Sequence, residues 1–198
     1  MLGTAQLAGG YGLTPGSTPS VGMVREILEL AREHGISAID TAIDYGDAER
    51  LLGSAGVCDM QIVTKLRLPC GIASDWSVRS WVRDSVVGSL SRLGVSQLHS
   101  VLVHHVGDLA GPLGTQLADA LNDIVDCGLS RQVGVSCYEP DDIGHTGMFD
   151  GPLTIQTPLS VLDRRFLSHG GIVAHEQDGW ERHAPQSTHR VTPAQQQK

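Results

Sequence analysis

The sequence lacks several features that would assign it to a large class of proteins. Its 198 residues include few aromatic residues (4%) and no apolar run that approaches the roughly 20 residues needed to cross a bilayer. The amino terminus also lacks the basic segment followed by an apolar one that marks a signal peptide. We therefore predict a cytoplasmic protein with no membrane partner.

Basic residues and paired cysteines are also scarce. Lys and Arg number 14 against 22 Asp and Glu, giving a formal net charge of -8, and they form no stripe that could neutralise nucleic-acid phosphates. The four cysteines, Cys58, Cys70, Cys127 and Cys137, include no CxxC pair. We therefore predict no nucleic-acid partner, no metal and no disulfide framework, and reduced thiols that mostly pack in the interior.

Helical and extended patterns alternate along the chain. Apolar residues recur at helical spacing after Ser20 and stop before Gly35, and a short apolar run follows at once. The expected helices are 21–34, 48–52, 76–93 (opened by Ser74 or Asp75) and 113–126, with a helical turn near Pro140; the expected strands are 36–40, 61–65, 98–104, 132–136 and 153–157. Alternating units of this kind predict an α/β protein with a parallel sheet, either a barrel or a doubly wound sheet.

Polar residues occur where the predicted strands end. They are Asp40, Lys65, His104, Ser136 and Gln156. Each has a structural explanation when taken singly, since an Asp can cap a helix and a lone His can be a satisfied core residue. The carboxyl ends of parallel strands meet at one rim, however, so the five side chains together favour a catalytic cleft.

One segment resembles the signature of a known family. Residues 35–46 read GISAIDTAIDYG and are followed by Glu49 and Gly53, which is similar to the aldo-keto reductase pattern G-x-x-x-(I/F)-D-T-A-x-x-Y-G-x-x-E-x-x-x-G. Further matches are LGTAQ (2–6), IVTK (62–65), SLSRLGVSQLHSVLVH (89–104), VGVSCY (133–138) and IQTPLSVLDRRF (155–166). The resemblance implies a TIM (β/α)8-type barrel.

A complete barrel of this type needs more residues than the chain has. The usual length is about 250 residues, so we expect an incomplete barrel of about six βα units over residues 1–168, from a truncated or frame-shifted product. Residues 169–198 form a divergent tail in which only 171–174 resembles a strand, and we expect disorder from about residue 176. The tail histidines His175, His183 and His189 lack partners at metal-ligand spacing, which favours a solvated segment.

The resemblance implies a catalytic set. Tyr45 corresponds to the general acid that protonates the carbonyl oxygen, Lys65 lies beside its hydroxyl, and Asp40 pairs with Lys65. A free phenol has a pKa near 10, and a neighbouring ammonium favours the phenolate. His104 corresponds to the residue that orients the substrate oxygen; His105 competes for this role, but the strand alternation and the family pattern favour His104.

The resemblance also implies a nicotinamide cofactor. The positions that line the nicotinamide ring in the family correspond to Gly3, Thr4, Ala5, Asp40, Ser136, Cys137 and Gln156, with Cys137 in place of the usual Asn. No G-x-G-x-x-G follows a strand, which excludes a Rossmann-type site as the main interpretation. Strands seven and eight, whose loops commonly bind the phosphates, are not visible, so cofactor binding is expected to be weakened by roughly three to six decades in Kd.

The expected function is that of an NADP(H)-dependent oxidoreductase, with NAD(H) as the alternative cofactor. It reduces a small aldehyde or ketone to an alcohol by hydride transfer, with Tyr45 as the acid. The segment PLSVLDRR resembles the bacterial branch associated with sugars and implies a sugar-like substrate. Three alternatives stay open: a catalytically inactive truncated fragment, a scaffold subunit completed by another chain, and a lyase that uses Lys65 as a Schiff base. The oligomeric state is not predicted.

Overall fold

The main structural feature is a curved parallel sheet. The computed structural model describes residues 1–8, 18–70, 77–160, 162–168 and 186–191. Its parallel strands are β1 (Leu2–Gly3), β2 (Ala38–Asp40), β3 (Gln61–Leu66), β4 (Leu98–Val103), β5 (Ser130–Ser136) and β6 (Leu153–Pro158). Each strand pairs with the next in chain order. This order excludes the doubly wound sheet, whose strand order reverses, and confirms an incomplete (β/α)8-type barrel of six units.

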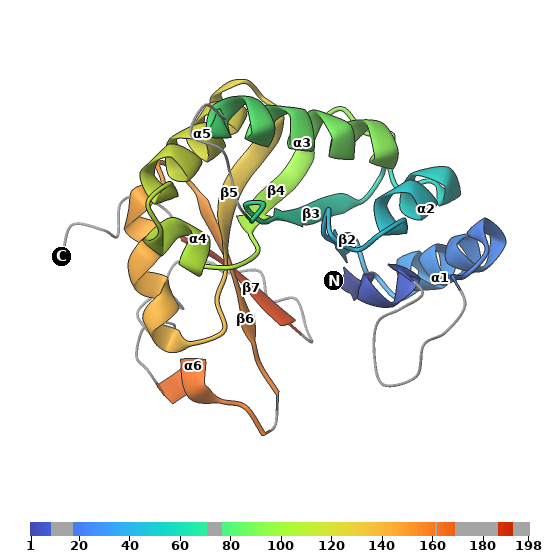
Figure 1. The fold of residues 1–198 in the computed structure, drawn as a ribbon. Helices are drawn as coiled ribbons and strands as arrows, with labels where there is room; N and C mark the ends of the chain where they lie inside the picture. The colour runs from blue at the N-terminus through green and yellow to red at the C-terminus, as the bar shows by residue number, and fades with distance from the viewer. Residues whose placement is uncertain (9–17, 71–76, 161, 169–185, 192–198) are drawn as a thin grey trace.

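Helices cover the outer side of the curved sheet. In Figure 1, α1 (Val21–Glu33), α2 (Ala48–Ala55), α3 (Val78–Leu93) and α5 (Gly114–Asp126) follow one another along that side. The shorter elements are η1 (Ala5–Ala8), α4 (Gly107–Ala110), η2 (Pro140–Met148) and α6 (Arg165–Ser168). The four longer helices confirm the predicted alternation, because each lies in one of the four connections from β1 to β5; the connection from β5 to β6 contains η2.

The helix boundaries follow local capping. Helix α1 begins after Ser20, whose side chain accepts a hydrogen bond from the Met23 N–H, as the sequence predicts. Helix α3 begins after Ser77, whose hydroxyl accepts from the Ser80 N–H at 3.2 Å, so the predicted start at residue 76 was too early. The predicted caps Ser74 and Asp75 lie outside the described residues.

A seventh strand differs from the sequence prediction. Strand β7 (Gln186–Val191) pairs antiparallel with β6, with Leu153 opposite Val191 and Pro158 opposite Gln186. The sequence predicts disorder from about residue 176, and for β7 that prediction was wrong. An unpaired strand edge offers backbone N–H and C=O groups to any extended segment, and this pairing needs no apolar pattern in the segment. The barrel boundary at residue 168 stays a prediction.

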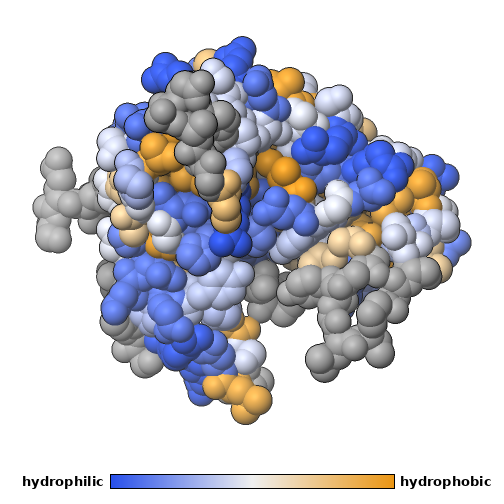
Figure 2. All heavy atoms as spheres, viewed as in Figure 1, coloured by the Kyte–Doolittle hydropathy of each residue, from blue (hydrophilic) through white to orange (hydrophobic). Residues whose placement is uncertain are grey.

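Three of the four cysteines lie at the surface. Cys58, Cys70 and Cys127 are exposed and only Cys137 is buried, so the prediction that the cysteines mostly pack inside was wrong for three of them; all four are free. Figure 2 shows a mostly hydrophilic face on which the hydrophobic patches are small and separate. Within the described ranges, no helix is both long and apolar enough to span a membrane.

Candidate active site

A buried ion pair lies at the carboxyl ends of β2 and β3. The Lys65 Nζ donates to Asp40 Oδ1 at 2.5 Å and to the Thr41 carbonyl at 3.0 Å. Asp40 is in register with Val63, and Lys65 lies two residues further along β3 on the same face. The side chains are 3% (Lys65) and 9% (Asp40) exposed. Burial lowers the pKa of the Lys65 ammonium, and the Asp40 carboxylate opposes that shift.

Tyr45 lies in the turn between β2 and α2, beside this ion pair. Its N–H donates to the Ala42 carbonyl at 3.1 Å, and its carbonyl accepts from the Ala48 N–H at 2.9 Å. The Lys65 Nζ lies 5.4 Å from the centroid of the Tyr45 ring. The His104 ring packs edge-on against the Tyr45 ring, with the centroids 5.9 Å apart and the planes at 78°. The structure therefore brings the four predicted catalytic residues together.

His104 is placed by the end of β3. Its N–H donates to the Leu66 carbonyl at 2.8 Å. Its Nδ1 is buried and lies 3.9 Å from Asp44 Oδ2, too far for a hydrogen bond, and no described group makes one with it. Burial and then the Lys65 charge lower the pKa of His104, against the opposing fields of Asp44 and Asp40. The neighbouring His105 instead accepts the Gly107 N–H at 3.1 Å in the turn before α4.

A pocket opens beside Tyr45 and Lys65. Its walls contain eight residues: Tyr45, Lys65, Ser136, Cys137, Tyr138, Gln156, Thr157 and Pro158. Ser136 and Gln156 face each other in the β5–β6 register, and the Cys137 N–H donates to the Gln156 carbonyl at 2.8 Å. Burial raises the pKa of the Cys137 thiol to about 12, with a smaller contribution from Asp142. The thiol is therefore neutral near pH 7 and is no nucleophile.

The predicted amino-terminal contacts lie beside the site and are not among the residues that line this pocket. Gly3 ends β1 in register with Asp40. The N–H and the hydroxyl of Thr4 both donate to the Asp40 carbonyl, at 3.0 and 2.9 Å. Ala5 begins η1. Thr4 thus fixes the end of β2, and the contact of these three residues with a nicotinamide stays a prediction.

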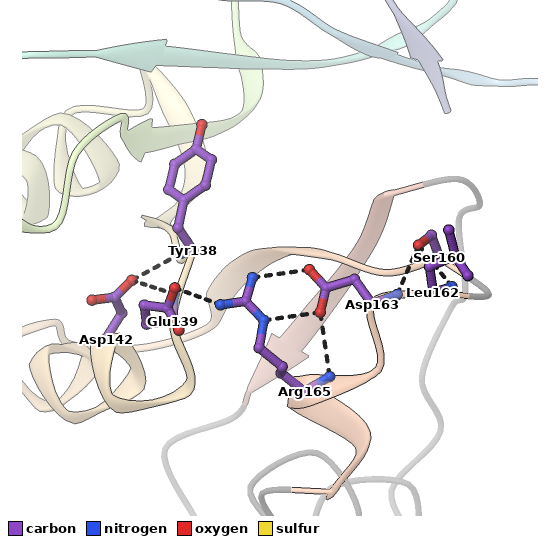
Figure 3. A network of polar contacts seen from close by, with 7 residues as sticks. All are labelled: Tyr138, Glu139, Asp142, Ser160, Leu162, Asp163 and Arg165. Atoms are coloured by element: carbon purple, nitrogen blue, oxygen red, sulfur yellow. Dashed lines mark hydrogen bonds and ion pairs between the residues drawn. The ribbon is translucent and has the colours of Figure 1, made fainter.

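Several residues at the pocket have no role that was predicted from the sequence. Tyr138 lies within the quoted motif VGVSCY, and Thr157 and Pro158 follow Gln156 on β6. Next to Tyr138, Glu139 forms an ion pair with Arg165, which also pairs with Asp163 (Figure 3). This ion pair could not be predicted from a local sequence pattern, because Glu139 and Arg165 are 26 residues apart in the chain and meet only in the folded structure.

The fold and the pocket define the class of protein. Six parallel strands curl into part of a barrel, and a Tyr, a Lys, an Asp and a His gather where the strands end, the position at which barrel enzymes carry their active sites. Residues 1–170 match the model of the aldo/keto reductase family. The chain belongs to this family.

Two curated relatives are sugar oxidoreductases. The chain is 30% identical over 153 residues to 6-dehydroglucose reductase of Novosphingobium aromaticivorans, a match that covers 69% of this chain and 49% of the relative. It is 31% identical over 172 residues to D-arabinose 1-dehydrogenase of Saccharomyces cerevisiae, covering 82% and 49%. The chain therefore spans about half the length of these relatives. Both relatives are oxidoreductases by name.

Solved structures share the fold. A thermostable aldo-keto reductase crystallised with the inhibitor epalrestat is 26% identical, with a TM-score of 0.70 and coverage of 90% of this chain and 64% of that one. A putative aldo-keto reductase from Pseudomonas aeruginosa is 26% identical, with a TM-score of 0.68 and coverage of 84% and 65%. An aldo/keto reductase from Klebsiella pneumoniae, solved with NADP and acetate, shares the fold at 24% identity and a TM-score of 0.55, covering 73% and 47%.

Proposed function

We propose that this chain reduces an aldehyde or ketone to an alcohol with NADP(H), with NAD(H) as the alternative, and that Tyr45 is the general acid. The observation that carries the proposal is the position of the Tyr45 ring, 5.4 Å from the Lys65 ammonium and 5.9 Å from the His104 ring. A proton donor, a cation and a hydrogen-bonding imidazole thus lie next to one another beside a pocket. This is the set of groups that carbonyl reduction needs.

The roles of the four side chains follow from charge. As the carbonyl carbon accepts a hydride, its oxygen gains negative charge and takes the proton from the Tyr45 hydroxyl. The Lys65 ammonium stabilises the phenolate that remains, and Asp40 holds the ammonium in place through the 2.5 Å hydrogen bond. His104, whose lowered pKa favours the neutral ring near pH 7, donates one N–H to the substrate oxygen.

The residues present fit a nicotinamide carboxamide. Ser136 and Gln156 are in register on neighbouring strands, are 5% and 3% exposed, and line the same pocket as Tyr45. A hydroxyl and an amide can supply both donors and acceptors to a carboxamide. When bound, the nicotinamide supplies the hydride. Cys137 supplies no amide, so this half of the site depends on Ser136 and Gln156.

The substrate class is a sugar-like carbonyl compound. Both curated relatives are named for sugar substrates, 6-dehydroglucose and D-arabinose. The pocket wall supports this choice, because Thr157 also lines the pocket and its hydroxyl can bind a substrate hydroxyl.

The test is NADPH oxidation, followed at 340 nm, by the purified chain with a panel of aldoses and small aldehydes. Tyr45→Phe is expected to lower kcat/KM by at least about 100-fold, because a positioned acid contributes 10²–10⁴-fold. Unchanged turnover in this variant would contradict the assignment. His104→Gln is expected to lower kcat/KM, while the matched control His105→Gln, altered in the turn before α4, keeps it.

A second candidate is a chain without catalysis, favoured by β7. This strand runs antiparallel to β6, so it does not continue the parallel βα repeat beyond β6. Titration of NADPH fluorescence separates the candidates: saturable binding contradicts the inactive chain.

For the lyase alternative, borohydride trapping is expected to give no Lys65 adduct, because Nζ is hydrogen-bonded to both Asp40 and Thr41.

A further inference from the structure

Tyr138 presents an uncovered aromatic ring at the wall of the pocket. It lines the pocket together with Tyr45 and Lys65, yet 56% of its surface is exposed. Among the described residues, no group hydrogen-bonds to its hydroxyl. A large aromatic residue ordinarily covers its ring by packing and finds a partner for its hydroxyl. A ring left open beside a catalytic pocket is therefore a candidate surface for a ligand.

The backbone that carries this ring is fixed. The N–H groups of Tyr138 and Glu139 both donate to Asp142 Oδ2, at 2.8 and 2.9 Å. Figure 3 shows this carboxylate beneath the backbone of the loop, while the ring of Tyr138 points away from the polar network. A ring on an ordered backbone has only two side-chain torsions to lose, which lowers the entropy cost of contact with a ligand.

An ion-pair network joins this loop to the next one. The Arg165 guanidinium contacts Asp163 through two bonds, from Nε to Oδ1 and from Nη2 to Oδ2, both at 2.9 Å. The same guanidinium pairs through Nη1 with Glu139. Exposed ion pairs contribute little when isolated, but a bidentate arginine within a network is geometrically specific. Arg165 thereby links the segment after β5 to the segment after β6.

We propose that Tyr138 is a specificity-determining residue whose ring covers one face of a cyclic substrate, and that the Glu139–Arg165 pair positions it. The placement of the substrate carbonyl at Tyr45 rests on the proposed function. Tyr138 and Tyr45 both line this pocket. A saturated or sugar ring whose carbonyl lies at Tyr45 turns a C–H face toward Tyr138, and flat aromatic rings bind such apolar faces well.

The first experiment compares two aldehydes with the same branching next to the carbonyl. One is cyclohexanecarbaldehyde, which has a ring, and the other is 2-ethylbutanal, which is open. Tyr138→Ala is expected to lower kcat/KM about tenfold for the cyclic aldehyde, which corresponds to about 1.4 kcal/mol, and less than about twofold for the open one. Tyr138→Phe keeps the ring and is expected to keep both values. An equal loss for the two aldehydes would overturn the proposal.

The positioning role has its own readout, the ratio of the two kcat/KM values. Arg165→Gln and Glu139→Gln are each expected to lower the ratio of the cyclic to the open aldehyde. Arg165→Lys is expected to restore part of this ratio. In the unmodified chain, 1 M salt is expected to lower it. Arg79→Gln, which breaks an exposed ion pair with Asp123 on the outer helices, is the matched control and leaves the ratio unchanged. A constant ratio in Arg165→Gln would remove the positioning role.

A binding measurement separates this inference from the proposed function. The chain is labelled with 3-fluorotyrosine, the Tyr138 fluorine signal is assigned by its loss in Tyr138→Phe, and cyclohexylmethanol is titrated in. A saturable shift of the Tyr138 signal, absent with 2-ethylbutanol, supports the ring contact even if no aldehyde is reduced. The proposal is overturned if the Tyr138 signal stays in place while the Tyr45 signal shows that the pocket is saturated. It is also overturned if no signal moves at high alcohol concentration.

Discussion

Asp40 and Lys65 are the two charges most completely removed from water at the site, with 9% and 3% of their side chains exposed. Lys65→Met would leave the Asp40 carboxylate buried without its cation. We expect the free energy of unfolding to fall by about 3–5 kcal/mol, measured by urea denaturation. The double variant Asp40→Asn with Lys65→Met, which removes both charges, is expected to recover most of the loss. Equal stability of the single and double variants would contradict a mutually dependent pair.

His104 gives the stability a pH dependence with a defined sign. Its folded-state pKa lies below the ordinary value of 6.5, chiefly through burial. As the pH falls below about 6.5, the unfolded chain binds a proton before the folded one does, so the folded state loses stability; above that pH the term vanishes. We expect the unfolding free energies of the unmodified chain and of His104→Gln to converge or cross as the pH falls from 8 to 5. The control His105→Gln is expected to follow the unmodified chain.

At the scale of elements, a buried carboxylate joins α2, β3 and α3. Glu49 is 1% exposed and accepts hydrogen bonds from Thr64 Oγ1 at 2.7 Å, Ser89 Oγ at 3.0 Å and Arg92 Nε at 2.8 Å. Glu49→Ala leaves these donors without their acceptor, and we expect a loss of about 3–5 kcal/mol in thermal or urea unfolding. The exposed Glu29→Ala on α1 is the control, with an effect of at most about 0.5 kcal/mol.

Strands β5 and β6 approach each other closely at one glycine. A Cβ on Gly134 would lie 1.7 Å from the Thr154 carbonyl oxygen, so the two strands must separate to admit it. We expect Gly134→Ala to lower stability by about 1–3 kcal/mol or more and to disturb the Ser136–Gln156 register at the pocket. Gly144→Ala, where nothing lies within 4 Å of the added Cβ, is the matched control. Equal melting temperatures for the two variants would contradict the close approach.

At the scale of the molecule, the incomplete barrel has two outer parallel strands, β1 and β6. Within the described part of the chain, neither has a further parallel strand on its outer side. Strand β7 covers the outer edge of β6 from Leu153 to Pro158. A chain that ends at Ser168 would expose that edge, and exposed edges pair between molecules. In that shortened chain, we expect the β6 amides to exchange hydrogen faster than in the unmodified chain. We also expect light scattering to show association that increases with concentration. Unchanged exchange and a constant mass would contradict the pairing of β7 with β6.

Features that depend on local sequence patterns could be predicted for this protein, whereas pairing between distant segments could not. Helical spacing between Ser20 and Gly35, and apolar runs that end in Asp40 or Lys65, are local patterns. Their alternation predicted a parallel sheet, and the resemblance to the family predicted the barrel that the strand order then showed. The 35–53 signature indicated the family, which the match over residues 1–170 then showed. Strand β7 could not be predicted, because its partner edge on β6 exists only after the barrel wall has formed.

The sequence by itself determined the order of the elements, the family and the identity of the polar residues at the strand ends, because periodicity and short motifs are properties of neighbouring residues. Only the tertiary structure decided which of those residues meet. It set Tyr45 against Lys65 and His104, left Thr4 bound to the Asp40 backbone, and opened Tyr138 to the pocket. Such contacts join residues distant along the chain, so they depend on the curvature of the sheet and on packing, which no local pattern encodes.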